Sequence, residues 1–476
     1  MRTSKSLTFL LSALLLLFNF ITAHVSFATD LAGSQLTYKY LGGNDYRVTY
    51  VLYRDCYAPL QAPVNEFLTV NSATLTFPLS YTMNQIAGTG NEILCVCPAA
   101  VTTCAGGLVT SIQKWVYEVD VTLPAQCPDW TFSVRHCCFS YGVTTGVNVH
   151  NNYSYAEARL NNTNSNNSSP RFTNEPVISI CQNQDYHYNN GLVDDEGDSL
   201  FYLLTPVLQN ENQSITYQPG FSSQQPLTSS PQVSLDPVTG DLFIHSTATE
   251  KGLITYTVYE FRNGMLLGSA TRTIMIVTGP CTNQMPVLSG INGTNQYSNY
   301  VFPGTNVCFD IYSNDADAAQ LLTLTWNDGI QAATFTTAGT PHPTGTFCWQ
   351  TSLSDLRTLP YDFTARIADD NCDYNGVQIY SYHIFVTLDS AQVWLNAPVR
   401  NGQPFISVSP NPTKGPIIIQ SSEIIERVKI FNDVGACIRN GRKEDAADIC
   451  TEPPGIYFLE ITSESGKRSV HKFIKE

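Results

Sequence analysis

Acidic turns hold the residues of this chain whose types and spacing could bind a metal ion. One turn places carboxylates at alternate positions around Gly197, and a second acidic turn follows more than a hundred residues later. The candidate ligands are Asp194, Glu196, Asp198, Asp315 and Asp317. Carboxylate oxygens are preferred ligands of Ca²⁺, although Thr205 stands where an EF-hand needs its closing Glu. We therefore expect calcium as the one candidate cofactor, against the alternative that these acids only form solvated turns.

Familiar catalytic motifs are absent from the sequence. It contains no Gly-x-Ser-x-Gly elbow, no His-Glu-x-x-His pair and no phosphate loop, and its histidines are scattered. The adjacent acids Asp369 and Asp370 cannot flank one glycosidic bond if they lie on a strand, because neighbouring strand residues face apart. The sequence therefore predicts a protein that is not an enzyme.

Short alternating segments predict an all-β protein that would position the acidic turns in its loops. Residues 36–40 and 46–52 alternate on either side of a Gly-Gly-Asn turn, which predicts a hairpin. We expect a disulfide-stapled β domain at 29–170, two immunoglobulin-like or cadherin-like sandwiches in tandem at 171–280 and 281–388, a linker at 389–403 and a small β-sandwich at 404–476. The polar stretch 151–169 is predicted to be a surface loop or linker.

The two predicted sandwiches look like distant copies of each other. Segments 200–204, 240–244, 254–258 and 273–277 correspond in order to 321–326, 345–349, 361–365 and 382–386. A repeat of this length predicts the same strand order in both copies.

Fourteen cysteines predict a disulfide framework of open connectivity. They are Cys56, Cys95, Cys97, Cys104, Cys127, Cys137, Cys138, Cys181, Cys281, Cys308, Cys348, Cys372, Cys437 and Cys450. Parity suggests that Cys181 bridges back to the N-terminal group, that 281–372 forms a closed set, and that Cys437 can pair with Cys450. The neighbours Cys137 and Cys138 are expected to take different partners, because strand neighbours point to opposite faces.

The N-terminal segment 1–28 has the pattern of a secretory signal peptide. Arg2 and Lys5 precede an apolar run of about 15 residues, shorter than the roughly 20 of a spanning helix, and 26–28 forms a small-x-small cleavage site. We expect an exported chain with no integral membrane segment after signal removal, in an oxidising compartment. The net charge of −15 argues against nucleic acid as a partner.

The last 73 residues contain a turn, three further strand patterns and a basic ending. The motif residues are Pro410, Asn411, Pro412, Gly415, Gly455, Ile456, Tyr457, Lys472 and Lys475. This segment resembles the C-terminal sorting domain of the type IX secretion system. The resemblance implies contact with the secretion machinery, passage through the periplasm to the outer cell surface or medium, and later removal of the domain within 395–403.

Motifs in the rest of the chain resemble those of large bacterial surface proteins associated with gliding or adhesion. They are Asn44-Asp45-Tyr46, Tyr53 to Cys56, Cys137-Cys138, Asn167 to Pro170, Asp194 to Leu200 and Ala368 to Cys372. The resemblance implies a non-catalytic binding or structural role, as an adhesin or surface-layer component that contacts surface glycans or proteins. The alternative is a carbohydrate-binding or carbohydrate-processing exoprotein that uses Trp115, Trp130, Trp326 and Trp394.

Overall fold

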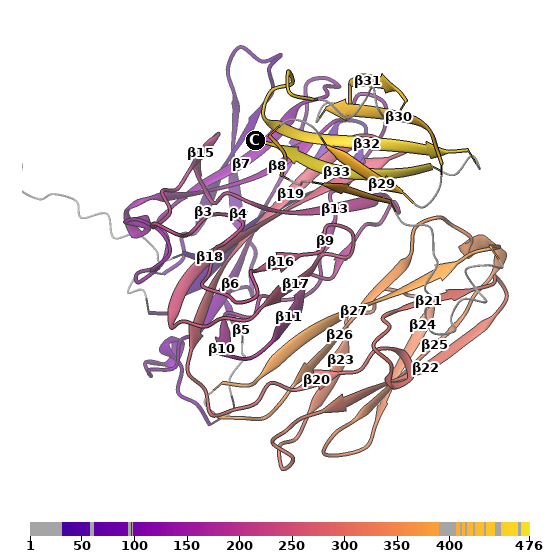
Figure 1. Cartoon of the computed structure of the whole chain (residues 1–476). Coiled ribbons are helices and arrows are strands. Elements are labelled where there is room, and N and C mark those ends of the chain that lie inside the picture. The colour runs from indigo at the N-terminus through magenta and orange to yellow at the C-terminus, as the bar shows by residue number, and fades with distance from the viewer. Residues whose placement is uncertain are drawn as a thin grey trace, which may run out of the picture.

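The protein is built from β-strands and short 3₁₀ turns, so the all-β prediction is confirmed (Figure 1). The computed structural model describes residues 31–57, 61–93, 97, 99–372, 374–389, 406–409, 412–414, 417–421, 424–432, 435–442, 449–464 and 468–476. The predicted signal peptide, nearly all of the predicted linker, and Cys95 lie outside this part. Within it, no helix is long and apolar enough to cross a membrane. The 3₁₀ turns are η1 (Thr103–Ala105), η2 (Val149–Asn151), η3 (Ile291–Gly293) and η4 (Leu353–Asp355).

The first part of the chain forms a large, strongly curved antiparallel sheet. Its strands are β1 (Leu31–Gly42), β2 (Asp45–Asp55), β3 (Asn65–Asn71), β4 (Leu79–Gln85), β5 (Asn91–Ile93), β6 (Ile112–Thr122), β7 (Trp130–Cys137) and β8 (Tyr153–Leu160). The predicted hairpin is present as β1 and β2. The order β1-β2-β6-β4-β3-β7-β8 ends on β19 (Met265–Gly279), and β1 also pairs with β19. Both ends of the sheet therefore meet on one long strand, which encloses the aromatic core.

The contact between β1 and β19 depends on a glycine. Gly33 lies opposite Ile274, and a Cβ atom at Gly33 would lie 2.3 Å from the carbonyl oxygen of Thr273. On the same strand, Arg272 is buried and donates hydrogen bonds to the Tyr53 hydroxyl, the Asn174 carbonyl oxygen and Asn190 Oδ1 at 2.8–2.9 Å. This guanidinium links three segments that are distant in sequence.

The predicted repeat is present as two copies with equivalent strand pairing. The first copy contains β10 (Ser179–Cys181), β11 (Tyr186–Asn189), β13 (Ser199–Thr205), β16 (Ser234–Leu235), β17 (Asp241–Ile244), β18 (Glu250–Arg262) and β19. The second contains β21 (Ser298–Val301), β22 (Asn306–Asn314), β23 (Thr323–Trp326), β24 (Ala333–Ala338), β25 (Thr344–Gln350), β26 (Tyr361–Ala368) and β27 (Val377–Val386), with β20 (Val287–Leu288) on β22. The order β10-β19-β18-β13 matches β21-β27-β26-β23, and β11-β17-β16 matches β22-β25-β24. The first strand of each four-stranded set is parallel to its neighbour.

The boundary predicted at residue 170 does not separate two sheets. Strand β19 of the first repeat also holds β1 and β8, so residues on both sides of the boundary share one 12-stranded sheet. Small two-stranded sheets lie beside it, formed by β9 (Arg171–Phe172) with β12 (Leu192–Val193) and by β14 (Leu208–Asn210) with β15 (Gln213–Ser214). The stretch 151–169, predicted as a surface loop, contains β8, and its Asn162, Asn167 and Ser169 are buried. Their amides and hydroxyls have partners inside the fold, which the local polarity of the sequence could not reveal.

The second repeat is fastened to the first repeat by apolar contacts and to the N-terminal sheet by a disulfide. Val377 and Ile379 pack in the same core cluster as Ile180 and Ile276, and Figure 1 shows the second repeat, in orange, lying against the first. Cys97 is bridged to Cys372 across 275 residues. The cysteine set 281–372 is therefore not closed, contrary to the prediction.

Other cysteine pairs also correct the predicted connectivity. Cys181 bridges to Cys281 because β10 runs parallel to the end of β19 and places Cys181 opposite Gly279. Cys137 and Cys138 are bridged to each other; Cys137 is the last residue of β7, so strand alternation does not separate them. The remaining bridges are Cys56–Cys104 and Cys308–Cys348. Cys127 is a buried free thiol, and the bridge considered between Cys437 and Cys450 is not formed.

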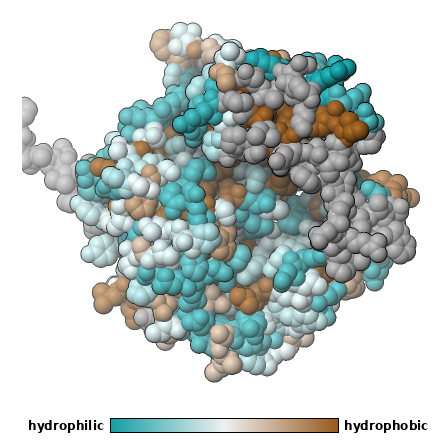
Figure 2. Space-filling view, in the orientation of Figure 1, coloured by the Kyte–Doolittle hydropathy of each residue, from teal (hydrophilic) through white to brown (hydrophobic). Residues whose placement is uncertain are grey.

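The C-terminal segment forms the predicted small domain. Its strands are β28 (Ile406–Ser409), β29 (Ile418–Ser421), β30 (Ile425–Asn432), β31 (Cys437–Gly441), β32 (Gly455–Ser463) and β33 (Arg468–Lys475). Phe458 of β32 inserts between Phe201 and Phe261 of the first repeat, with ring centroids 6.4 and 6.2 Å apart. Figure 2 shows mostly polar and mixed surface, with apolar side chains gathered over this domain at the upper right.

Candidate metal centre

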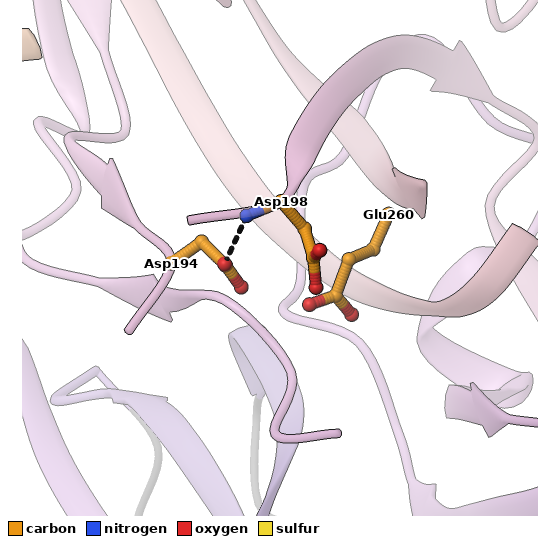
Figure 3. A group of neighbouring side chains, drawn as sticks. All are labelled: Asp194, Asp198 and Glu260. Atoms are coloured by element: carbon orange, nitrogen blue, oxygen red, sulfur yellow. Dashed lines mark hydrogen bonds between the residues drawn. The ribbon is translucent and has the colours of Figure 1, made fainter. Parts of the chain in front are cut away.

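Three carboxyl groups converge at one end of the first repeat (Figure 3). Asp194 follows β12, Asp198 immediately precedes β13, and Glu260 lies on β18 opposite Leu200 of β13. One carboxylate oxygen from each residue lies within 4.8 Å of the others. The pairing of β13 with β18 therefore brings an acid near the end of a long strand into the acidic turn.

Hydrogen bonds hold these three side chains in place. Asp194 Oδ1 accepts the backbone N–H of Asp198 at 2.6 Å, which closes the turn. Both oxygens of Asp198 accept hydrogen bonds from the Arg262 guanidinium, at 2.7 and 2.6 Å. Asn167 Nδ2 donates to Glu260 Oε2 at 2.5 Å. The buried Asn167 thus connects the segment before the first repeat to the carboxyl cluster.

Glu260 is the most perturbed acid of the group. Its side chain is fully buried. Burial raises the pKa of Glu260 to about 10, and a hydrogen bond and the negative charge of the nearby Asp194 add to the rise. The carboxyl group is therefore neutral near pH 7 when only protons are available to it.

The structure brings together only part of the predicted ligand set. Asp194 and Asp198 belong to the cluster, but Glu196 Oε1 instead accepts the backbone N–H of Ser168 at 3.1 Å. Asp315 and Asp317 do not join a group of three acids among the described residues. Glu260 was missed because its neighbours in sequence are ordinary strand residues, and only the β13–β18 register places it in the site.

A chain of hydrogen-bonded Ser, His and Asp side chains lies between the two repeats, with Ser381 and His383 buried and Asp362 exposed. His383 Nδ1 lies 2.7 Å from Asp362 Oδ1, and His383 Nε2 lies 3.0 Å from Ser381 Oγ. The Ser381 hydroxyl donates to Asp241 of the first repeat at 2.8 Å. Burial opposes the charged imidazole, but hydrogen bonding to Asp362 and the negative charges of Asp362 and Asp241 outweigh burial and raise the pKa of His383.

The Ser381, His383 and Asp362 side chains are connected as in a catalytic triad, but the serine proton goes to a different partner. A nucleophilic serine gives its proton to the histidine and must reach a substrate. Here the proton of Ser381 is held by Asp241, and Ser381 is only 5% exposed. The arrangement therefore links the two repeats through the Ser381 hydroxyl and Asp241.

An open hollow of about 420 Å³ also lies between the repeats. Its lining includes Asp185, His187, His245, Asp315 and Tyr380. The His187 ring stacks on Tyr380 with centroids 4.9 Å apart, and burial lowers the pKa of His187. The hollow combines aromatic faces with hydrogen-bonding groups, as ligand sites between domains commonly do.

The tryptophans predicted to bind carbohydrate differ in burial. Trp130 is fully buried, and Trp326 is partly buried, stacked on Phe335 and packed against the core of the second repeat. Trp115 is half-buried in β6, and Trp394 lies outside the described residues. Burial therefore excludes Trp130 from stacking on a sugar.

The sorting motif residues that the structure describes gather at one edge of the C-terminal domain. The turn residue Thr413, which follows Pro412, pairs with Lys475, and Thr413 N–H donates to the Ile474 carbonyl oxygen at 2.8 Å. The Tyr457 ring stacks on Phe473 at 5.7 Å. Gly455 and Ile456 begin β32, and burial lowers the pKa of Lys472 in β33 to about 8. Pro410, Asn411 and Gly415 lie outside the described residues.

Comparison with known proteins identifies this C-terminal domain. Residues 407–476 match the family model described as the secretion system C-terminal sorting domain. The chain therefore carries a type IX secretion sorting domain, which indicates export to the cell surface or secretion. No curated protein matches the chain.

Solved structures of multi-domain β proteins resemble the chain only weakly. Drosophila N-cadherin EC1-4 is 13% identical, with 74% of this chain and 83% of that chain covered and a TM-score of 0.18. The insect immune protein hemolin is 13% identical, with 64% and 76% covered and a TM-score of 0.14. Dpr2 Ig1-Ig2, solved with DIP-Theta, is 10% identical, with 46% and 98% covered and a TM-score of 0.20.

Proposed function

We propose that the protein is a non-catalytic binding or structural protein of the cell surface, an adhesin or surface-layer component exported through the type IX system. The observation that carries this proposal is the sorting domain at residues 407–476, behind a body made of β-sheets and long-range disulfides. Export requires the sorting domain, and the cross-linked body suits a protein that works outside the cell.

The way the two repeats are joined favours a role of the body as a rigid support for a binding surface. The apolar core shared by the repeats and the Cys97–Cys372 bridge oppose bending between them. Loops and the hollow beside Tyr380 offer surfaces to a partner. Surface glycans or proteins are the partner classes that fit this mixed aromatic and hydrogen-bonding lining.

Export is tested by expressing the full chain and a chain that lacks residues 404–476. The full chain should reach the cell surface or medium, and the truncated chain should remain in the periplasm. Equal surface delivery of both would refute the proposed route.

Adhesion is tested separately, by comparing attachment of cells with the gene, without it and with it restored. Loss of attachment on deletion and its return on restoration are expected. Unchanged attachment would contradict the adhesin role. Turnover of a polysaccharide by the purified protein would instead establish the alternative, a carbohydrate-processing exoprotein.

A further inference from the structure

Two buried carboxyl oxygens of the cluster receive no hydrogen bond from the N–H and hydroxyl groups around them. Glu260 is fully buried, and its Oε1 receives no hydrogen bond from a donor group; the same holds for Asp194 Oδ2. Buried polar atoms without partners are rare and costly in folded proteins. Two facing carboxyl groups can be joined only by a shared proton or by a cation.

The geometry of the cluster fits a hard divalent cation. Oxygen atoms on opposite sides of a Ca²⁺ ion lie about 4.8 Å apart, since each Ca–O distance is about 2.4 Å. The ligand oxygens of Asp194, Asp198 and Glu260 lie within 4.8 Å of one another. One ion can therefore reach all three residues without a rearrangement of the strands.

The charges of the cluster also fit one divalent cation. Arg262 forms a two-point ion pair with Asp198 and neutralises one of the three carboxylates. Two negative charges then remain when all three acids are ionised. A single divalent cation balances them, which is the condition for burying such charges at low cost.

We propose that Asp194, Asp198 and Glu260 bind one Ca²⁺ ion, independently of the proposed surface function. Oxygen-only donors disfavour zinc and copper, which prefer nitrogen or sulfur ligands. Ca²⁺ tolerates an irregular ligand set completed by water, whereas Mg²⁺ demands a near-ideal octahedron. In this ligand set, Glu260 of β18 takes the place that the sequence pattern assigned to Glu196 of the acidic turn.

Calcium at this position ties together segments that are separate in sequence. Asn167 holds Glu260 through its amide nitrogen, and its Oδ1 accepts a hydrogen bond from Arg262 at 3.2 Å. The ion would thus lock the acidic turn, the end of β18 and the segment that leads from the first sheet into the repeat. We expect binding to stabilise the body of the protein.

The second repeat contains a partial copy of the arrangement. Asn283 stands three residues before Pro286, as Asn167 stands three residues before Pro170, and Asn283 Nδ2 donates to Asp369 Oδ2 at 2.7 Å. Among the described residues, no third acid joins Asp369 and Asp315 within ligand distance. We therefore assign one calcium ion to the described part of the chain.

The test is calorimetric titration of the chelator-treated full chain with CaCl₂ and, separately, with MgCl₂. Glu260→Gln keeps the size of the side chain but removes its charge, and should weaken calcium binding roughly tenfold or more, as loss of even an outer-shell partner can. Asp195→Asn is the matched control, because Asp195 lies in the same turn but is exposed and pairs with Arg171. The control should bind one ion with the affinity of the parent.

Thermal unfolding with and without calcium provides a second readout that does not depend on heats of binding. Calcium should raise the Tm of the parent and of the Asp195→Asn variant, and leave the Tm of the Glu260→Gln variant unchanged. Absence of both a binding heat and a Tm shift in the parent would overturn the proposal. Parent-like binding by Glu260→Gln would also overturn it, and equal affinity for magnesium would overturn the choice of calcium.

Discussion

Removal of the bridge between Cys97 and Cys372 tests whether the second repeat forms one rigid body with the N-terminal sheet and the first repeat. The bridge spans 275 residues of sequence. Two other bridges inside this span already close loops of 100 and 40 residues in the unfolded chain. The loop that the Cys97–Cys372 bridge itself closes is therefore about 135 residues long. The loop-closure entropy corresponds to about 5 kcal/mol, an upper limit because native bridges typically contribute about 2–4 kcal/mol.

The variant carries Cys97→Ser and Cys372→Ser and is unfolded with guanidinium chloride while tryptophan fluorescence is followed. Trp349 lies in the core of the second repeat and reports its unfolding. We expect the second repeat to unfold in a separate transition at lower denaturant concentration. A single transition at the midpoint of the parent would refute the argument that this bridge holds the second repeat to the rest of the body.

The matched control removes the bridge between Cys308 and Cys348. These residues face each other on β22 and β25, and their bridge closes a loop of 40 residues inside the second repeat. Loss of this bridge should lower the free energy of unfolding of the second repeat by at most about 4 kcal/mol. The apolar contacts between the repeats and the Cys97–Cys372 bridge to the N-terminal part remain in the control, so the second repeat should still unfold together with the rest of the body.

Three other substitutions, one of them paired with a control, test interior and interdomain contacts. Arg272→Met removes the donor from three buried oxygens within 2.9 Å and should lower the free energy of unfolding by roughly 3–5 kcal/mol in denaturant unfolding. The control Arg47→Met removes an exposed guanidinium and should have a much smaller effect, and equal losses would contradict the role of burial. Because the pKa of His383 is raised in the folded protein, the charged imidazole stabilises the fold fully below about pH 6.5. This stabilisation is lost as the pH rises through the pKa of the folded state. Asp362→Asn should flatten this pH dependence of the unfolding midpoint, and an unaltered slope would argue against the pair. Phe458→Ala should loosen the C-terminal domain and increase the maximum dimension in small-angle scattering, and an unchanged scattering profile would argue against the docking contact.

Local patterns were sufficient for the elements of this fold and for its repeat. Alternation along residues 36–40 and 46–52 identified β1 and β2, because each strand buries one face. The corresponding segments of the two repeats do pair in the same order, since both copies keep the apolar positions of a sandwich. The sorting domain was recognisable for a similar reason, because its turn residues and strands are continuous in sequence.

Contacts between distant segments were decided only by the tertiary structure. Counting cysteines by region could not pair Cys97 with Cys372, because the repeat that carries Cys372 folds back onto the first sheet. The polarity of Asn167 suggested a solvated loop, whereas the structure gives its amide a buried carboxyl partner. The sequence by itself determined the strands, the repeat and the acidic turn. Only the tertiary structure placed Glu260, the third acid of the candidate metal centre, beside the acidic turn. The hydrogen-bonded register between β13 and β18 decides which residues meet, and no local sequence pattern predicts that register.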